Sequence, residues 1–183
     1  MPNECFICVD VETAGPNPAD YSMLSLGAVL VSDVQQEFYA EFKPINMNNT
    51  AEAQSVHGLS LEALAQTGLE PAEGMQRFAD WLAQVCQGQP PVLVAFNAPF
   101  DWMFVADYFH HYLDNNPFGH RAIDIKAVYM GLHGGPWAEA SFQQVSQRYG
   151  LPQMLNHNAL DDARQTAVMF AAILAEIKES RHA

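Results

Sequence analysis

Five side chains in this chain of 183 residues combine types and spacings that suit metal-assisted chemistry. Asp10 and Glu12 are separated by one residue, and Asp101 ends the string Asn-Ala-Pro-Phe-Asp. His157 and Asp162 belong to the string His-Asn-Ala-Leu-Asp-Asp. No cluster of cysteines or histidines at zinc spacing accompanies them, and oxygen ligands of this kind favour Mg²⁺ or Mn²⁺. The set therefore predicts a site for hard divalent cations.

The first pair of acids follows an apolar run that is typical of a strand buried on both faces, Cys5 to Val11. An ionised carboxylate there is costly unless a cation or a hydrogen-bond donor compensates it. Residues i and i+2 of a strand point the same way, so Asp10 and Glu12 present two carboxylates to one place. This geometry is that of a ligand pair for a metal.

The predicted cations indicate a reaction at phosphorus. Two divalent ions held about 4 Å apart activate a water and stabilise the leaving oxygen of an in-line displacement. The histidine adds a group whose ordinary pKa of about 6.5 suits proton abstraction from that water. His157 is therefore the candidate general base.

The remaining site residues must be positioned by helices. Asn97 is expected to cap a helix with Pro99 in its first turn, so that Asp101 follows the carboxyl end of a strand at 91–96. The last helix should begin near Asn158 and run to about Lys178. Asp162 would then lie in its first turns, with His157 in the preceding loop and Asp161 solvated.

The other elements complete an α/β domain. Apolar runs at 23–31 and 37–42 should pair as a hairpin, and helices are expected at 70–86 and 141–149, with a brief strand at 123–125. Hydrophobic residues make up 49% of the chain, enough for the core of one domain over residues 1–183. We expect a mixed central sheet of about five strands flanked by helices.

Three motifs in this order resemble those of the DEDDh 3′→5′ exonuclease family: Asp-Val-Glu-Thr at 10–13, Asn-x-x-Phe-Asp at 97–101 and His-x-Ala-x-x-Asp at 157–162. Within that family the chain is similar to ribonuclease T, through Asp-Val-Glu-Thr-Ala-Gly, and to proofreading exonucleases, through the segment at 57–59. The resemblance implies a ribonuclease H-like fold. It also implies hydrolysis of the 3′-terminal phosphodiester of single-stranded RNA or DNA, with release of nucleoside monophosphates.

The resemblance assigns a role to each of the five residues. Two Mg²⁺ or Mn²⁺ ions are implied, with Asp10, Glu12 and Asp162 as ligands of the inner ion and Asp10 bridging to the second. Asp101 would act directly or through bound water, and His157 would take the proton from the attacking water.

The resemblance also implies a set of substrate-binding residues. Backbone groups around Val11 and Thr13, together with the loop formed by His57, Gly58 and Leu59, would fix the terminal sugar and base.

The charge of the chain limits the substrates. With 21 acidic and 8 basic residues the formal net charge is −13, and no Lys/Arg cluster is present, which disfavours long duplexes and large folded RNA. Short single strands are expected, with a slight preference for RNA from the ribonuclease T likeness, which also suggests a homodimer. Two other functions stay open: a phosphohydrolase of small nucleotides, and a nuclease-like module that binds a nucleic-acid end or a protein.

Three cysteines, Cys5, Cys8 and Cys86, are an odd set that predicts buried thiols in a reducing compartment. Cys5 and Cys8 should project to opposite faces of one strand and share no metal. The Met-Pro-Asn-Glu start lacks the basic residues of a secretory signal, and no apolar run is long enough to span a bilayer. A cytoplasmic location is expected.

Aromatic residues and histidines outside the motifs have mostly structural interpretations. The pair His110-His111 lies at a polar helix end and is expected on the surface of the protein. Trp137, in Gly-Gly-Pro-Trp, is a candidate platform for base stacking. Spacing predicts a core location for the aromatic residues at the start of the helix near residue 100 (Phe100, Trp102 and Phe104).

Overall fold

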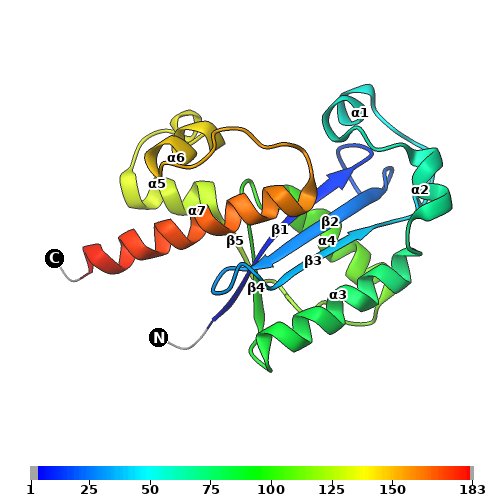
Figure 1. Cartoon of the computed structure of the whole chain (residues 1–183), viewed down its shortest axis with the longest axis horizontal. Helices are drawn as coiled ribbons and strands as arrows, with labels where there is room; N and C mark the ends of the chain where they lie inside the picture. Colours follow the sequence, from blue (N-terminus) through cyan, green and yellow to red (C-terminus); the bar gives the residue numbers. More distant parts are fainter. Residues whose placement is uncertain (1–3, 182–183) are drawn as a thin grey trace.

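The computed structural model describes residues 4–181 and contains a mixed five-stranded sheet with the strand order β3-β2-β1-β4-β5 (Figure 1). β1 is antiparallel to β2, as is β2 to β3, whereas β1 is parallel to β4 and β4 to β5. β1 therefore lies at the centre of the sheet. The strands are Cys5–Thr13 (β1), Met23–Leu30 (β2), Glu37–Glu41 (β3), Pro91–Ala95 (β4) and Ala122–Asp124 (β5).

Helices cover both faces of the sheet (Figure 1). α3 and α4 pack on one face, and α5, α6 and α7 pack on the other. The helices are Ala51–His57 (α1), Leu61–Thr67 (α2), Pro71–Cys86 (α3), Pro99–Tyr112 (α4), Ile125–His133 (α5), Phe142–Arg148 (α6) and Ala159–Ser180 (α7), with a 3₁₀ turn, η1, at Trp137–Glu139.

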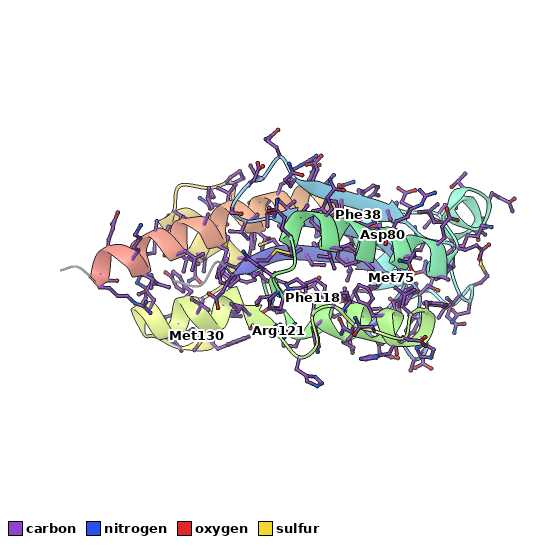
Figure 2. All side chains as sticks on the ribbon, turned by 90° about the horizontal axis from the view of Figure 1, so that it is seen from below. Phe38, Met75, Asp80, Phe118, Arg121 and Met130 are labelled. Carbon is purple, nitrogen blue, oxygen red and sulfur yellow. A yellow bond between two sulfur atoms is a disulfide. The ribbon has the colours of Figure 1, made fainter. Side chains whose placement is uncertain are left out.

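The side chains of β1 divide between two core layers, which confirms that this strand is buried on both faces. Ile7 and Val9 belong to the layer under α3 and α4, which also contains Met75 and Phe118 (Figure 2). Cys8 belongs to the layer under α5, α6 and α7. Because side chains alternate along a strand, the residues in phase with Cys8 face α7. Asp10 and Glu12 are in that phase.

The long elements agree with the sequence predictions to within two residues at each end, whereas α1, α2 and α5 were not predicted as helices. Their start signals are present. Thr50, Ser60 and Asp124 each cap a helix by accepting a backbone N–H at 3.1 to 3.2 Å. Helices of seven and nine residues contain too few turns for a clear apolar period, and so the caps were the better indicator.

The prediction of three buried thiols is wrong for two of them. Cys5 and Cys86 form a disulfide that joins the start of β1 to the end of α3, with 5.5 Å between their Cα atoms; Figure 2 includes its yellow bond. Cys8 is free and buried in the opposite core layer, as expected for residues i and i+3 of a strand. The disulfide partners are 81 residues apart, and so only the fold reveals the pairing.

Helices long and apolar enough to cross a bilayer are absent from residues 4–181. The expectation about a secretory signal rests partly on residues 1–3, which lie outside the described range.

Candidate active site

Two antiparallel strands align the first carboxylates. Asp10 pairs with Gly27 of β2, and Glu12 pairs with Ser25. Both acids lie toward the carboxyl end of β1, past Cys8, the last residue that pairs with β4. The predicted common direction of Asp10 and Glu12 is therefore confirmed by the register, and the face that they share is the one that α7 covers.

Gly27 allows the amino end of α7 to approach β2. A Cβ at this position would overlap the carbonyl group of Ala159 and the nitrogen of Leu160. Ala159 is itself fully buried and is the first residue of α7. A glycine on the strand and a small residue at the helix start thus let the helix begin directly beside the carboxylates of β1, which is why the third motif contains an alanine between its histidine and its aspartate.

Asp162 fastens the loop that carries the candidate base. One of its carboxylate oxygens accepts the backbone N–H of Asn156 and the other accepts that of His157, both at 3.0 Å. His157 has a positive φ of 59°, an uncommon conformation outside glycine. The Asn158 side chain caps α7 by accepting the Asp161 N–H. These bonds fix the backbone of His157, while its residue surface stays exposed.

Asp101 contacts β1 from the opposite side. Its Oδ1 accepts the backbone N–H of Val11 at 3.1 Å. Val11 lies beyond the segment of β1 that pairs with β4. One oxygen of this buried carboxylate is thereby engaged. The prediction that Asn97 caps this helix is wrong. Ala98 is the cap residue, and Asn97 has a positive φ of 61° that turns the chain from β4 into α4.

The predicted residues converge at the amino end of α7. The potential ligand atoms of Glu12, His157 and Asp162 lie within 4.8 Å of one another. Asp10 and Asp101 are outside this trio, but the carboxylate of Asp10 is close enough to those of Asp101, Glu12 and Asp162 for each to raise its pKa. Asp161 is exposed and bonds to Arg164 and Asn156, as the solvated interpretation predicts.

Burial and mutual repulsion disfavour the ionised form of the four carboxylates in the site. Burial, reinforced by the neighbouring acids, raises the pKa of Asp10, and burial with the charge of Asp162 raises that of Glu12 to about 7. Burial raises the pKa of Asp101 to about 8, against the hydrogen bond from Val11, and also raises that of Asp162. Among residues 4–181, no Lys or Arg forms an ion pair with any of these four. The donor set therefore fits divalent cations, which would supply the missing positive charge.

A pocket of about 340 Å³ adjoins the carboxylates and shares Glu12 with them. Val11, Thr13 and His57, three of the predicted substrate-binding residues, line it. Gly58 and Leu59 do not. Gly58 is the exposed left-handed cap of α1, and the Leu59 N–H donates to His57 Nδ1 at 2.8 Å, so Leu59 helps to orient the His57 ring.

Phe100 also lines this pocket, and its predicted core location is wrong. It is the second residue of α4 and is 39% exposed, whereas Phe104 is fully buried. The two rings do contact each other, with centroids 5.4 Å apart, as their spacing of four residues implies. The sequence signal that could have identified Phe100 is its place in the second motif, next to Asp101.

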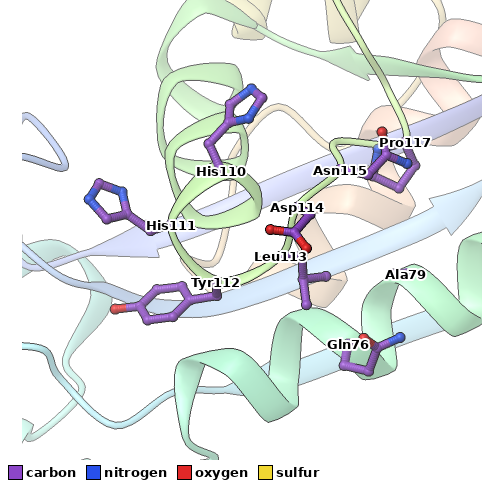
Figure 3. A pocket seen from close by; sticks show the side chains of 9 residues that line it. All are labelled: Gln76, Ala79, His110, His111, Tyr112, Leu113, Asp114, Asn115 and Pro117. Carbon is purple, nitrogen blue, oxygen red and sulfur yellow. The ribbon is translucent and has the colours of Figure 1, made fainter.

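A second hollow of about 460 Å³ lies between α3 and the end of α4 and contains none of the motif residues (Figure 3). His110 and His111 project from the last turn of α4 there, and both are exposed, as predicted. Within residues 4–181 these histidines do not join a third potential metal ligand in a compact group. The motif residues therefore adjoin the smaller pocket and not this hollow.

Known proteins resemble this chain in sequence and in fold. The family model RNase_T, described as exonuclease, matches residues 7–170. The 3′-5′ DNA exonuclease Cap18 of Escherichia coli is 41% identical over 171 residues, which cover 93% of this chain and 91% of that protein. The PolC-type DNA polymerase III of Thermotoga petrophila is 24% identical over 97% of this chain, but only over 12% of the polymerase.

Two solved structures illustrate the common fold. The nuclease domain of 3′hExo, a DEDDh family member bound to rAMP, superposes with a TM-score of 0.79 at 16% identity, covering 94% of this chain and 92% of that one. An E. coli ExoI–ssDNA complex gives a TM-score of 0.71 at 17% identity, covering 98% and 42%. The ribonuclease H-like fold predicted from the motifs is confirmed. With the family model covering most of its length, the chain belongs to the DEDDh family and is a 3′→5′ exonuclease.

Proposed function

We propose that this exonuclease removes nucleotides from the 3′ end of single-stranded DNA and releases nucleoside 5′-monophosphates. One observation carries the proposal: Glu12 belongs both to the carboxylate and histidine cluster and to a pocket of about 340 Å³ beside it. A pocket of that volume accepts one nucleoside, so that the phosphodiester on its 5′ side would lie at the carboxylates.

The carboxylates would hold two Mg²⁺ or Mn²⁺ ions. In this proposal Asp10, Glu12 and Asp162 would hold one ion, Asp10 would also contribute to the second, and Asp101 would act directly or through bound water. Bound ions of this kind lower the pKa of a water and stabilise charge on phosphate oxygens. The family depends on metal, and the raised pKa values of these four acids support the same requirement in this chain.

His157 would act as the general base. Its ring lies within 4.8 Å of carboxylate oxygens of Glu12 and Asp162, and its exposed position gives the abstracted proton a path to solvent. The hydrogen bond from its backbone to Asp162 holds the residue at the edge of the cluster. The imidazole would take the proton from the attacking water as the oxygen–phosphorus bond forms.

The terminal nucleoside would occupy the pocket beside Glu12. The half-exposed ring of Phe100 provides an apolar wall for a base. Because His57 Nδ1 accepts the Leu59 N–H, the neutral ring carries its proton on Nε2. That buried Nε2 has no partner among the described residues, so it is available to donate to a sugar or base oxygen.

The choice of DNA rests on the relative that is 41% identical and is named a DNA exonuclease, since the match covers 91% of that protein. The likeness to ribonuclease T favours RNA, which stays a prediction. A phosphohydrolase of small nucleotides and a non-cutting binding module are the alternatives that a chain-length series would distinguish. The homodimer likewise stays a prediction, to be checked by light scattering after size exclusion.

The test is a time course on matched 5′-labelled single-stranded DNA and RNA of one sequence, with Mn²⁺ or with EDTA. We expect a ladder that shortens from the 3′ end, depends on Mn²⁺ and advances faster on DNA, with 5′-monophosphates as the product. Faster shortening of RNA would reverse the sugar preference. An unchanged oligonucleotide, with hydrolysis of dinucleotides only, would replace the proposal with the small-nucleotide phosphohydrolase.

A further inference from the structure

Trp137 and Lys126 form a contact that the proposed catalytic steps do not use. The Lys126 ammonium lies over the Trp137 ring, 4.1 Å from its centroid, and Trp137 is 50% exposed. The two residues are brought together by the turn after α5. Gly134 and Gly135 both have positive φ, 71° and 90°, a conformation that glycine adopts without strain, and the chain then folds back over the first turn of α5.

This Lys126–Trp137 pair is linked to the candidate active site through Asp124. Asp124 is the last residue of β5, and its Oδ1 accepts the backbone N–H groups of Lys126 at 3.1 Å and of Asn97 at 3.0 Å. Asn97 begins the turn that leads to Asp101, and the charge of Asp124 contributes to the raised pKa of Asp101. Lys126 therefore lies just past the carboxyl end of β5, at the start of α5, and Figure 1 draws α5 on the left of the molecule and α1 on the right.

Charge distinguishes the two directions in which a nucleic-acid strand could leave the carboxylates. Toward β3, Glu41 is in register with Ser25 and hence with Glu12, and Glu37 and Asp161 hold Arg164 between them. Phosphates on that side would meet acids. Toward α5, a strand meets Lys126, which makes no ion pair with a carboxylate in the described part of the chain.

Most other basic side chains of residues 4–181 are occupied. Carboxylates pair with Lys43, Arg77, Arg148 and Arg164, and backbone carbonyls engage Arg121. In a chain of net charge −13, an unpaired lysine held against an exposed aromatic ring has the two groups that single-strand sites use, a cation for the phosphate and a ring for the base.

We propose that Trp137 and Lys126 bind a nucleotide upstream of the scissile phosphate, with its base against the exposed part of the indole and its phosphate at the ammonium. The proposal rests on the proposed function, because the strand direction follows from placing the terminal nucleoside beside Phe100. It defines a specificity for chains: substrates that extend beyond the terminal nucleotides gain a contact that short ones cannot make.

The test compares Trp137→Ala and Lys126→Ala with the wild-type enzyme on (dT)₁₀ and on thymidine 5′-(p-nitrophenyl phosphate), which has no upstream nucleotide. Trp137→Ala should raise KM for (dT)₁₀ by about tenfold, the effect of losing one stacked base. Lys126→Ala should raise the same KM through the loss of the phosphate contact, and both variants should leave both kinetic constants for the small ester unchanged. Lys126→Ala should also reduce the slope of log KM against log salt by about 0.7, as for one lost phosphate contact on a single strand. Lys178→Ala, an exposed lysine near the end of α7, is the matched control and should change neither.

A binding measurement tests the inference without the alanine variants, so its result does not depend on whether those variants fold. In the Asp10→Asn background, (dT)₁₀ should quench tryptophan fluorescence, and Trp137→Phe should remove that quenching while retaining most of the affinity. Equal KM values for (dT)₁₀ in wild type and variants, or an equal rise for the small ester, overturn the inference, since the pair would then only pack α5 against η1. A wild-type enzyme that hydrolyses the ester but not (dT)₁₀ would instead reject the proposed function.

Discussion

The carbonyl group of Ala159 lies where a side chain at Gly27 would begin, and this contact sets the distance between β2 and the start of α7. Strand and helix carry different parts of the site: Glu12 is paired with the residue two positions before Gly27, and Asp162 is in the first turn of α7. The proximity of the two carboxylates therefore depends on a residue that has no functional group.

Replacing Gly27 with Ala should damage both stability and activity. The new methyl group overlaps backbone atoms, which cannot move aside as a flexible side chain could, so we expect a loss of about 1–3 kcal/mol in urea unfolding and weaker Mn²⁺ binding. Gly131→Ala is the control. No atom lies within 4 Å of a Cβ at Gly131 in α5, and the helix should gain slightly in stability. Wild-type Mn²⁺ affinity in Gly27→Ala would show that α7 tolerates displacement.

Replacing His157 with Ala should lower the rate by about 10² to 10⁴ and leave Mn²⁺ binding nearly unchanged, because the side chain is proposed to move a proton and not to hold the ions. Titration calorimetry and single-turnover kinetics separate these two effects. A rate close to that of the wild type would assign the base to another group.

The neighbouring acids Asp161 and Asp162 offer a matched pair of substitutions. Asp162→Asn removes a buried carboxylate and one of two acceptors for the loop, so we expect activity to fall by more than about 100-fold. Asp161→Asn removes an exposed partner of Arg164, which keeps its two bonds to Glu37, and activity should stay within about twofold. Similar losses in both variants would mean that the helix start, not the Asp162 carboxylate, is the sensitive feature.

The metal-free enzyme should lose stability as the pH rises. Glu12 holds its proton up to a pH of about 7 in the folded state, against an ordinary value of 4.5, and the pKa of Asp101 is raised to about 8. Between the ordinary pKa and the raised pKa of each group, the folded state binds more protons than the unfolded state. The free energy of unfolding therefore decreases as the pH rises through that range. Thermal melts with EDTA should show a lower Tm at pH 8 than at pH 5.5.

Added Mn²⁺ should remove that difference, because the cation replaces the protons. Asp10→Asn should raise the Tm of the metal-free protein at pH 8 and reduce the effect of Mn²⁺ on it. A Tm with EDTA that does not change between the two pH values would mean that the folded state does not raise the pKa values of these carboxylates.

Breaking the disulfide should lower stability without lowering the turnover of the folded enzyme. It closes a loop of 81 residues, and the loss of such a bond costs about 2–5 kcal/mol, or roughly 2–4 °C of Tm per kcal/mol. Cys86→Ser tests this, with a reducing agent as the second measurement, which should destabilise the wild type and leave Cys86→Ser unaffected. An equal effect of the reducing agent on both would point to a cause other than the disulfide.

The sequence predicted the parts of the site that depend on local spacing. The phase of Asp10 and Glu12 follows from strand alternation, and the start of α7 follows from its cap at Asn158. The errors concern long-range relations. The Cys5–Cys86 pairing depends on where α3 ends relative to β1, which no local spacing reveals. The exposure of Phe100 depends on the pocket that its ring lines, and helical spacing alone does not reveal that pocket.

The two hydrogen bonds from the 156–157 backbone to Asp162 fix the position of the candidate base relative to a candidate metal ligand. The interval of five residues between His157 and Asp162 is therefore fixed by contacts inside the loop as well as by the helix. Inserting or deleting a single residue there should inactivate the enzyme as thoroughly as replacing either side chain, even though both would still be present in the chain. The third motif therefore depends on the spacing between its histidine and its aspartate as much as on the identity of those residues.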